Sequence, residues 1–183
     1  MLLNDTPIKT TASFHNDLLM AKELVYDKSG FEFQNYKLHS ESTDYGACSF
    51  ELNGNKVQYR VSKITPTKKG QFVTIWKRSD SGITVPFDVL DDVDLVIIST
   101  RCGEHFGQFI FPKSVLAEKG IMRQNGKEGK RGIRVYPPWD TFLNKQAEKT
   151  QRWQTLYFFT ITPPSTIKIP VSTNQISMFS KVI

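Results

Sequence analysis

The segment GKEGKRGIRVYPPW, residues 126–139, combines residue types that bind phosphate with residue types that stack on bases. Its three glycines alternate with cationic side chains, and glycine lets backbone N–H groups approach an anion closely. An aromatic and proline-rich corner follows directly, and aromatic rings beside positive charge are typical of single-strand nucleic-acid binding. The candidate residues are Lys127, Lys130, Arg131, Arg134, Tyr136 and Trp139.

Other segments add positive charge. Seven Lys or Arg residues and no Asp or Glu occur between Lys56 and Arg78, whereas residues 79–100 contain five Asp residues and no basic residue. The net charge of +6 favours encounters with polyanions. We therefore expect distant basic segments to converge into one groove that binds nucleic acid; the alternative is a solvated surface with core aromatics. The additional candidates are Lys63, Lys68, Lys69, Lys77, Arg78, Lys113 and Trp153.

A second constellation pairs a carboxylate with a lysine. Asn53-Gly54 is the strongest short signal for a two-residue hairpin turn, and the register of that turn places Asp44 opposite Lys63. Metal-dependent phosphodiesterases use carboxylates to hold Mg²⁺ and a lysine to orient or activate the attacking water. Such a site normally needs an acid two residues before the lysine, where this chain has Val61; Glu41 is another candidate ligand, but the spacing does not require it. A simple ion pair is the alternative.

Cysteine and glycine motifs argue against several other site classes. Cys48 and Cys102 lack CxxC spacing and a Cys/His cluster, so we expect two reduced, buried thiols and neither a disulfide framework nor a zinc site. Cys102 and His105 share one expected hairpin loop, where a reactive thiol is a weaker alternative. The loop GKEGKRG fits neither GxxxxGK[ST] nor GxGxxG and precedes a strand, which disfavours a nucleotide pocket.

The elements that position these residues follow from hydrophobic periodicity. A helix is expected from Ser13 to Gly30, then a hairpin of residues 47–52 and 55–64. Strands are expected at 71–78, 83–87, 93–99, 107–112 and 132–136, with a short helix at 113–120 and a loop at 65–70. A long helix at 141–159 would start from Asp140 as N-cap. This order predicts an α+β fold with a mixed, mostly antiparallel sheet flanked by helices.

Length and composition predict a single domain over residues 13–161, with a flexible N-terminus at 1–12 and an extended arm at 162–183. The apolar run 93–99 is expected at the sheet centre, buried on both faces. Neither a membrane span nor a secretion signal is recognisable, so we expect a cytoplasmic protein without a membrane partner. The oligomeric state stays open.

Four segments carry a family resemblance. TPTKKGQFVTIWKR, GQFIFPKSVLAEKGI, GKRGIRVYPPW and KTQRWQTLYF together span most of residues 45–159, and the chain resembles the MepB family through them. These are small bacterial proteins named for a gene found beside a multidrug efflux pump and its regulator. The resemblance implies a core similar to the restriction-endonuclease-like fold, DNA binding and an incomplete nuclease metal site, which Val61 would match.

The leading hypothesis is a non-catalytic nucleic-acid-binding protein, with DNA as the expected polymer, no cofactor, and Asp44 and Lys63 as remnants of a nuclease-like site. One alternative is a nuclease with an atypical site that requires Mg²⁺. Another is a small-molecule-binding accessory protein linked to drug tolerance, with the aromatic residues lining its pocket. Positive charge disfavours cationic drugs as ligands of such a pocket, because like charges repel.

Overall fold

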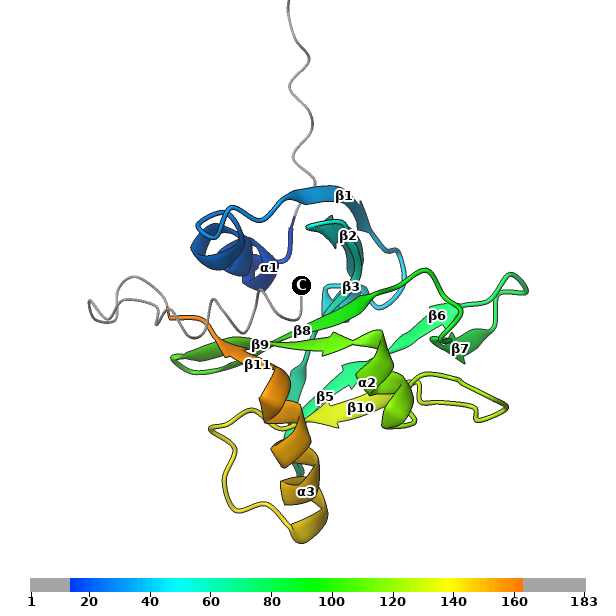
Figure 1. The fold of residues 1–183 in the computed structure, drawn as a ribbon. Helices are drawn as coiled ribbons and strands as arrows, with labels where there is room; N and C mark the ends of the chain where they lie inside the picture. The colour runs from blue at the N-terminus through cyan, green and yellow to red at the C-terminus, as the bar shows by residue number, and fades with distance from the viewer. Residues whose placement is uncertain (1–13, 163–183) are drawn as a thin grey trace, which may run out of the picture.

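Two β-sheets and a β-hairpin form the framework of the protein (Figure 1). The structure is a computed structural model that describes residues 14–162. The larger sheet has six strands in the order β1-β2-β3-β8-β9-β11, and the smaller has three in the order β10-β5-β4. The α+β class, with a mixed and mostly antiparallel sheet, is confirmed. The large-sheet strands are β1 (Phe33–Leu38), β2 (Cys48–Leu52), β3 (Asn55–Val61), β8 (Leu95–Cys102), β9 (His105–Pro112) and β11 (Phe158–Thr160).

The hairpin of β2 and β3 has the predicted turn and register. Asn53 and Gly54 adopt φ angles of 50° and 77°, as a two-residue turn between twisted strands requires. Cys48 lies opposite Tyr59 and Phe50 opposite Val57, so the apolar side chains share one face. This face packs on α1 (Asn16–Ala21) and the π-helical turn Lys22–Tyr26 that continues it.

Strand β8 lies inside the large sheet, with β3 parallel on one side and β9 antiparallel on the other. Its residues alternate between two cores. Leu95 and Ile97 face the core beneath α1, while Val96 and Ile98 face a second core built with the small sheet and α2 (Lys113–Glu118). Figure 1 shows α1 on one side of the large sheet and α2, α3, β5 and β10 on the other.

The region expected as one strand over residues 71–78 is divided in the structure. Strand β5 (Lys68–Thr74) joins β4 (Lys63–Thr65) and β10 (Gly132–Val135) in the small sheet, whereas β6 (Trp76–Arg78) pairs with β7 (Thr84–Pro86). The break falls at Ile75, whose buried side chain belongs to the second core. The expected loop 65–70 therefore shrinks to a tight connection, and Lys68 and Lys69 lie on β5.

The long C-terminal helix was predicted too long at both ends. Helix α3 spans Lys145–Gln154, and its N-cap is Asn144, whose Oδ1 accepts the Ala147 N–H at 2.9 Å, rather than Asp140. A 3₁₀ turn at Thr155–Tyr157 then leads into β11, which pairs with β9. Pairing requires Gly107, because a Cβ at this residue would overlap the Phe158 ring and the Phe159 carbonyl.

None of the helices within residues 14–162 is long and apolar enough to cross a membrane. The segments predicted as a flexible N-terminus (1–12) and an extended arm (162–183) lie outside the described residues, apart from Thr162.

Candidate nucleic-acid interface

A hollow of about 430 Å³ lies between α3, β10 and the end of α2. We call it the basic groove, because three cationic side chains line it and none of its lining residues is acidic. Lys119 pairs with Glu118 at 2.7 Å, whereas Lys130 and Arg134 take part in none of the ion pairs found within residues 14–162. The residues of the groove used below are Lys119, Lys130, Arg134, Tyr136, Gln146, Trp153 and Gln154.

Gln154 fixes one wall of the basic groove. Strand β10 is the edge of the small sheet, so its outer backbone groups have no neighbouring strand. The Gln154 side chain replaces that strand: its Oε1 accepts the Tyr136 N–H at 2.9 Å, and its Nε2 donates to the Arg134 carbonyl at 2.9 Å. Gln154 is only 1% exposed. This contact holds α3 beside β10 and keeps Arg134 and Tyr136 on the groove.

Arg134 also reaches a second hollow. Its guanidinium donates to the Gly70 carbonyl at 3.1 Å and to Thr65 Oγ1 at 2.8 Å. Both acceptor residues line a hollow of about 310 Å³ that also includes Lys68 and Lys69. The structure therefore brings Lys68, Lys69, Lys130 and Arg134 into two neighbouring hollows.

One acid lies at the second hollow. Burial raises the pKa of the Asp140 carboxyl above its usual range, and the positive charge of Lys69 partly opposes that shift. A raised pKa means that the protonated, uncharged form of Asp140 is favoured more than in an exposed aspartate. Where it is ionised, the Asp140 carboxylate offsets part of the positive charge of Lys68 and Lys69 at this hollow.

The three predicted aromatic residues have different positions. Tyr136 and Trp153 line the basic groove, with Trp153 also packed at 5.4 Å from Phe111. Trp139 does not line it: its ring stacks on His105 at 5.2 Å and meets Phe158 edge-on at 5.4 Å. Trp139 therefore joins the loop after β10 to the β8–β9 hairpin rather than offering a free stacking surface in the groove.

Several predicted cations lie away from the basic groove. Asp91 binds two of them: its carboxylate pairs with the Lys77 ammonium, and its backbone carbonyl accepts a hydrogen bond from Lys113 Nζ at 3.2 Å. Arg131 pairs with Glu128 at 3.0 Å. Arg78 donates to the Gly82 carbonyl at 2.9 Å and lies over Trp76, and Lys127 is exposed at the loop tip. The expectation of a single groove containing all the cations is thus wrong; the structure groups a smaller set.

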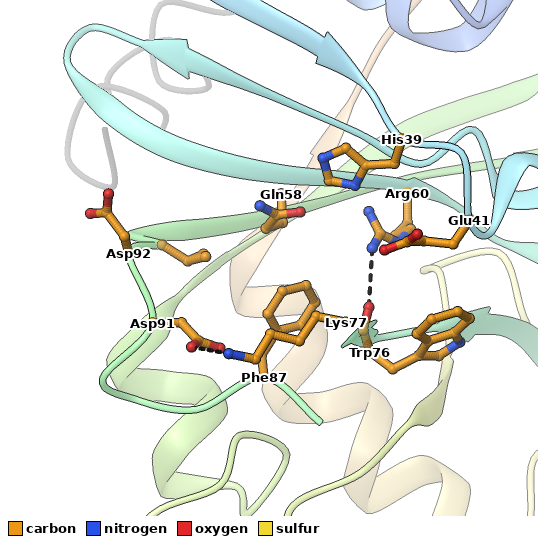
Figure 2. Close-up of a pocket in the computed structure, with 10 residues that line it drawn as sticks. His39, Glu41, Gln58, Arg60, Trp76, Lys77, Phe87, Asp91 and Asp92 are labelled. Atoms are coloured by element: carbon orange, nitrogen blue, oxygen red, sulfur yellow. Dashed lines mark hydrogen bonds and ion pairs between the residues drawn. The ribbon is translucent and has the colours of Figure 1, made fainter. Parts of the chain in front are cut away.

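Figure 2 shows another hollow, of about 240 Å³, around Arg60. Arg60 is 2% exposed and donates to the Tyr59 carbonyl at 2.7 Å and the Trp76 carbonyl at 3.3 Å, so it links β3 to β6. Burial lowers the pKa of Arg60 to about 10, which still leaves it charged at neutral pH. Glu41, Asp91 and Asp92 line the same hollow. Three carboxylates disfavour a polyanion here, so we assign Arg60 a structural role.

Asp44 and Lys63 meet, but on the surface. Their side chains are 3.8 Å apart and 83% and 44% exposed, respectively. The β2–β3 ladder ends at Cys48 and Tyr59, and Lys63 instead pairs with Phe72 on β5 while its ammonium lies 4.7 Å from the Tyr45 ring. The predicted contact therefore forms through a loop and the small sheet, not through the hairpin register.

The two cysteines differ in exposure. Cys48 is buried as expected, but Cys102 is exposed, because it ends β8 at the turn that leads into β9. Burial raises the pKa of the Cys48 thiol to about 12, so its reactive thiolate is suppressed at neutral pH. We expect one thiol per native molecule to react rapidly with a disulfide reagent at pH 8 and the second only after unfolding. Two rapid thiols in the native protein would contradict this assignment.

Sequence reasoning missed Lys119 and Gln154. Lys119 follows α2 directly and no local motif distinguishes it from a surface lysine. Gln154 lies in KTQRWQ, where its spacing from Trp153 gives no indication of an edge strand nearby. Only the packing of α3 on β10 reveals either role.

Comparisons with known proteins place this geometry in context. The MepB-like family model matches residues 39–160. A protein whose structure was solved as "Crystal Structure of MepB" is 32% identical, with a TM-score of 0.71 over 85% of this chain and 100% of that chain. The bacterial homing endonuclease I-Ssp6803I is 16% identical, with a TM-score of 0.43 over 77% of this chain and 89% of that chain, which is too low to bear on function. No curated protein matches.

Proposed function

The chain belongs to the MepB-like family, and we propose that it is a non-catalytic, cytoplasmic nucleic-acid-binding protein that holds the phosphate backbone of DNA in the basic groove. The observation that carries this proposal is a hollow lined by Lys119, Lys130 and Arg134 without an acidic side chain. Phosphate contacts of this kind give affinity without sequence specificity.

The neighbouring hollow extends the same surface. Lys68 and Lys69 line it, and Arg134 connects it to the basic groove through its contacts with Thr65 and Gly70. The strand β10 between them is held rigidly by Gln154 and by its pairing with β5. A phosphate backbone crossing Arg134 would therefore meet about five cations, each of which can release counterions from the polyanion.

The non-catalytic part of the proposal follows from the chemistry of the candidate nuclease residues. Lys63 has one carboxylate neighbour, the exposed Asp44, and Val61 occupies the place of a further acid. Glu41 lines the Arg60 hollow, away from that pair. The Asp44 carboxylate is 83% exposed and already pairs with Lys63, so it offers Mg²⁺, which demands near-ideal octahedral geometry, a single weakly positioned ligand.

Salt dependence tests the proposal directly. With about five phosphates neutralised, the slope of log affinity against log salt concentration is expected to be about −3.5 for single strands and about −4.5 for duplexes. Fluorescence anisotropy of labelled single- and double-stranded oligonucleotides, measured across a salt series, gives this slope.

Two results would contradict the proposal. An affinity independent of salt would exclude phosphate contacts as its source, and Mg²⁺- or Mn²⁺-dependent nicking of plasmid that disappears in Lys63→Ala would show catalysis at the Asp44 site.

A further inference from the structure

Phe142 is a large aromatic residue held in solvent. Its exposed fraction is 93%, and it lies in the loop between β10 and α3. Single exposed apolar residues are common on protein surfaces and by themselves indicate nothing. The backbone of Phe142, however, also has a φ of 55°, in the left-handed region that bulky residues rarely occupy.

The other residues with this backbone geometry are of different types. Among non-glycine residues in the described part of the chain, positive φ occurs otherwise at Asn35, Ser42, Asn53 and Asn125. Asparagine tolerates this region because its short polar side chain forms local hydrogen bonds. The phenyl ring of Phe142 cannot form such a hydrogen bond, and it is not buried. Strained backbone that exposes a side chain is more common at ligand-binding sites than elsewhere.

The surroundings of Phe142 favour an anionic partner. Asp140, two residues earlier, lines the hollow of Lys68 and Lys69, and Gln146, four residues later, lines the basic groove. Lys145 and Lys149 on α3 are exposed, and no ion pair within residues 14–162 includes either of them. Phe142 thus lies in a loop whose flanking residues line both hollows.

We propose that Phe142 is a stacking platform for an unpaired nucleobase, which makes single-stranded nucleic acid the preferred partner of the basic groove. This inference rests on the proposed function. Every base has a π face, so stacking on Phe142 would add affinity without sequence preference. In a duplex those faces are covered by neighbouring bases, so the ring could contact one only where the stack is opened. Trp139 and Trp153 pack against other rings, whereas Phe142 presents its ring to solvent.

Substitutions at Phe142 distinguish the effect of backbone strain on stability from the effect of the ring on nucleic-acid binding. Phe142→Gly removes the ring and accepts the positive φ without steric cost, so the melting temperature is expected to stay unchanged or rise. Affinity for a labelled dT oligonucleotide is expected to fall about tenfold, a typical effect of losing one stacking residue. Phe142→Trp should retain wild-type affinity. Leu90→Gly is the matched control, because Leu90 is 91% exposed but lies beside the acidic Asp91 corner, and it should leave affinity unchanged.

A second readout reports stacking itself. An oligonucleotide containing 2-aminopurine should lose fluorescence on binding to the wild type and the Trp variant, and lose less on binding to Phe142→Gly. If wild-type protein binds oligonucleotides with the expected salt slope and Phe142→Gly binds them equally well, the stacking inference fails while the proposed function stands. If Phe142→Gly weakens duplex binding as much as single-strand binding, the single-strand preference is wrong. If the wild type binds no oligonucleotide, both proposals fail.

Discussion

Lys130→Glu is expected to weaken nucleic-acid binding by about 10- to 100-fold, or about 1.4–2.8 kcal/mol, because a phosphate contact is replaced by repulsion from a carboxylate in the basic groove. Lys130 is exposed, lines the groove and is included in no ion pair within the described residues, so its ammonium is available to a phosphate. Its side chain supports no other element, and the melting temperature should change by no more than about 2 °C. Anisotropy titrations at a single salt concentration, with thermal melts alongside, measure both quantities.

Lys127→Glu is the matched control for this charge reversal. Both lysines lie in the same glycine-rich loop, and each substitution lowers the net charge by two, from +6 to +4. Long-range attraction of the polyanion therefore falls equally in the two variants, but Lys127 lies at the loop tip outside the groove lining. We expect its affinity to fall by less than about threefold. Equal losses in the two variants would show that net charge, and not the basic groove, determines binding.

Local sequence signals predicted much of the fold. Asn53-Gly54 set the β2–β3 register because a two-residue turn allows only one alignment of alternating apolar residues. The continuous run of apolar residues in β8 predicted that both faces of this strand are buried, and it too is a property of a short segment. The long C-terminal helix was overestimated because Tyr157, Phe158 and Phe159 are apolar at successive positions and fit either a helix or a strand. Pairing with β9, a contact of high sequence separation, decides for the strand.

The candidate site was less predictable than the fold. Charge and glycine content singled out the segment of Lys130 and Arg134, since both are properties of a short stretch of sequence, and both side chains line the basic groove. The number of cations available to a phosphate depends instead on acids that are distant in sequence. Asp91 contacts Lys77 and Lys113 only because β6, the 88–93 loop and α2 pack together in the fold. The exposure and backbone angle of Phe142 likewise follow from how the loop spans β10 and α3, which no spacing rule describes.

Gln154→Leu is expected to destabilise the protein by about 2–4 kcal/mol, because it leaves two partly buried backbone groups at the edge of β10 without a partner and each costs about 1–3 kcal/mol. The groups are the Tyr136 N–H and the Arg134 carbonyl, both of which now bond the Gln154 carboxamide at 2.9 Å. Leucine is similar in size and adds apolar contact, so the loss reflects hydrogen bonding rather than a cavity. For a domain of this size the melting temperature should fall by about 4–16 °C, and amide exchange at Tyr136 should accelerate.

Gln146→Leu controls for the chemical change. Gln146 lies on the same helix and lines the same groove, but its side chain is exposed, so its replacement should alter stability by no more than about 0.5 kcal/mol. Gln154→Glu distinguishes the two bonds, because a carboxylate still accepts from Tyr136 but an ionised one does not donate to the Arg134 carbonyl. The melting temperature of that variant should rise as the pH falls, because the protonated carboxyl group is uncharged and can again donate to the Arg134 carbonyl. Equal melting temperatures for Gln154→Leu and the wild type would mean that water replaces the side chain on β10, and the Gln151 hydrogen bonds to the Pro137 and Asp140 carbonyls would then be the contacts that tie α3 to the loop after β10.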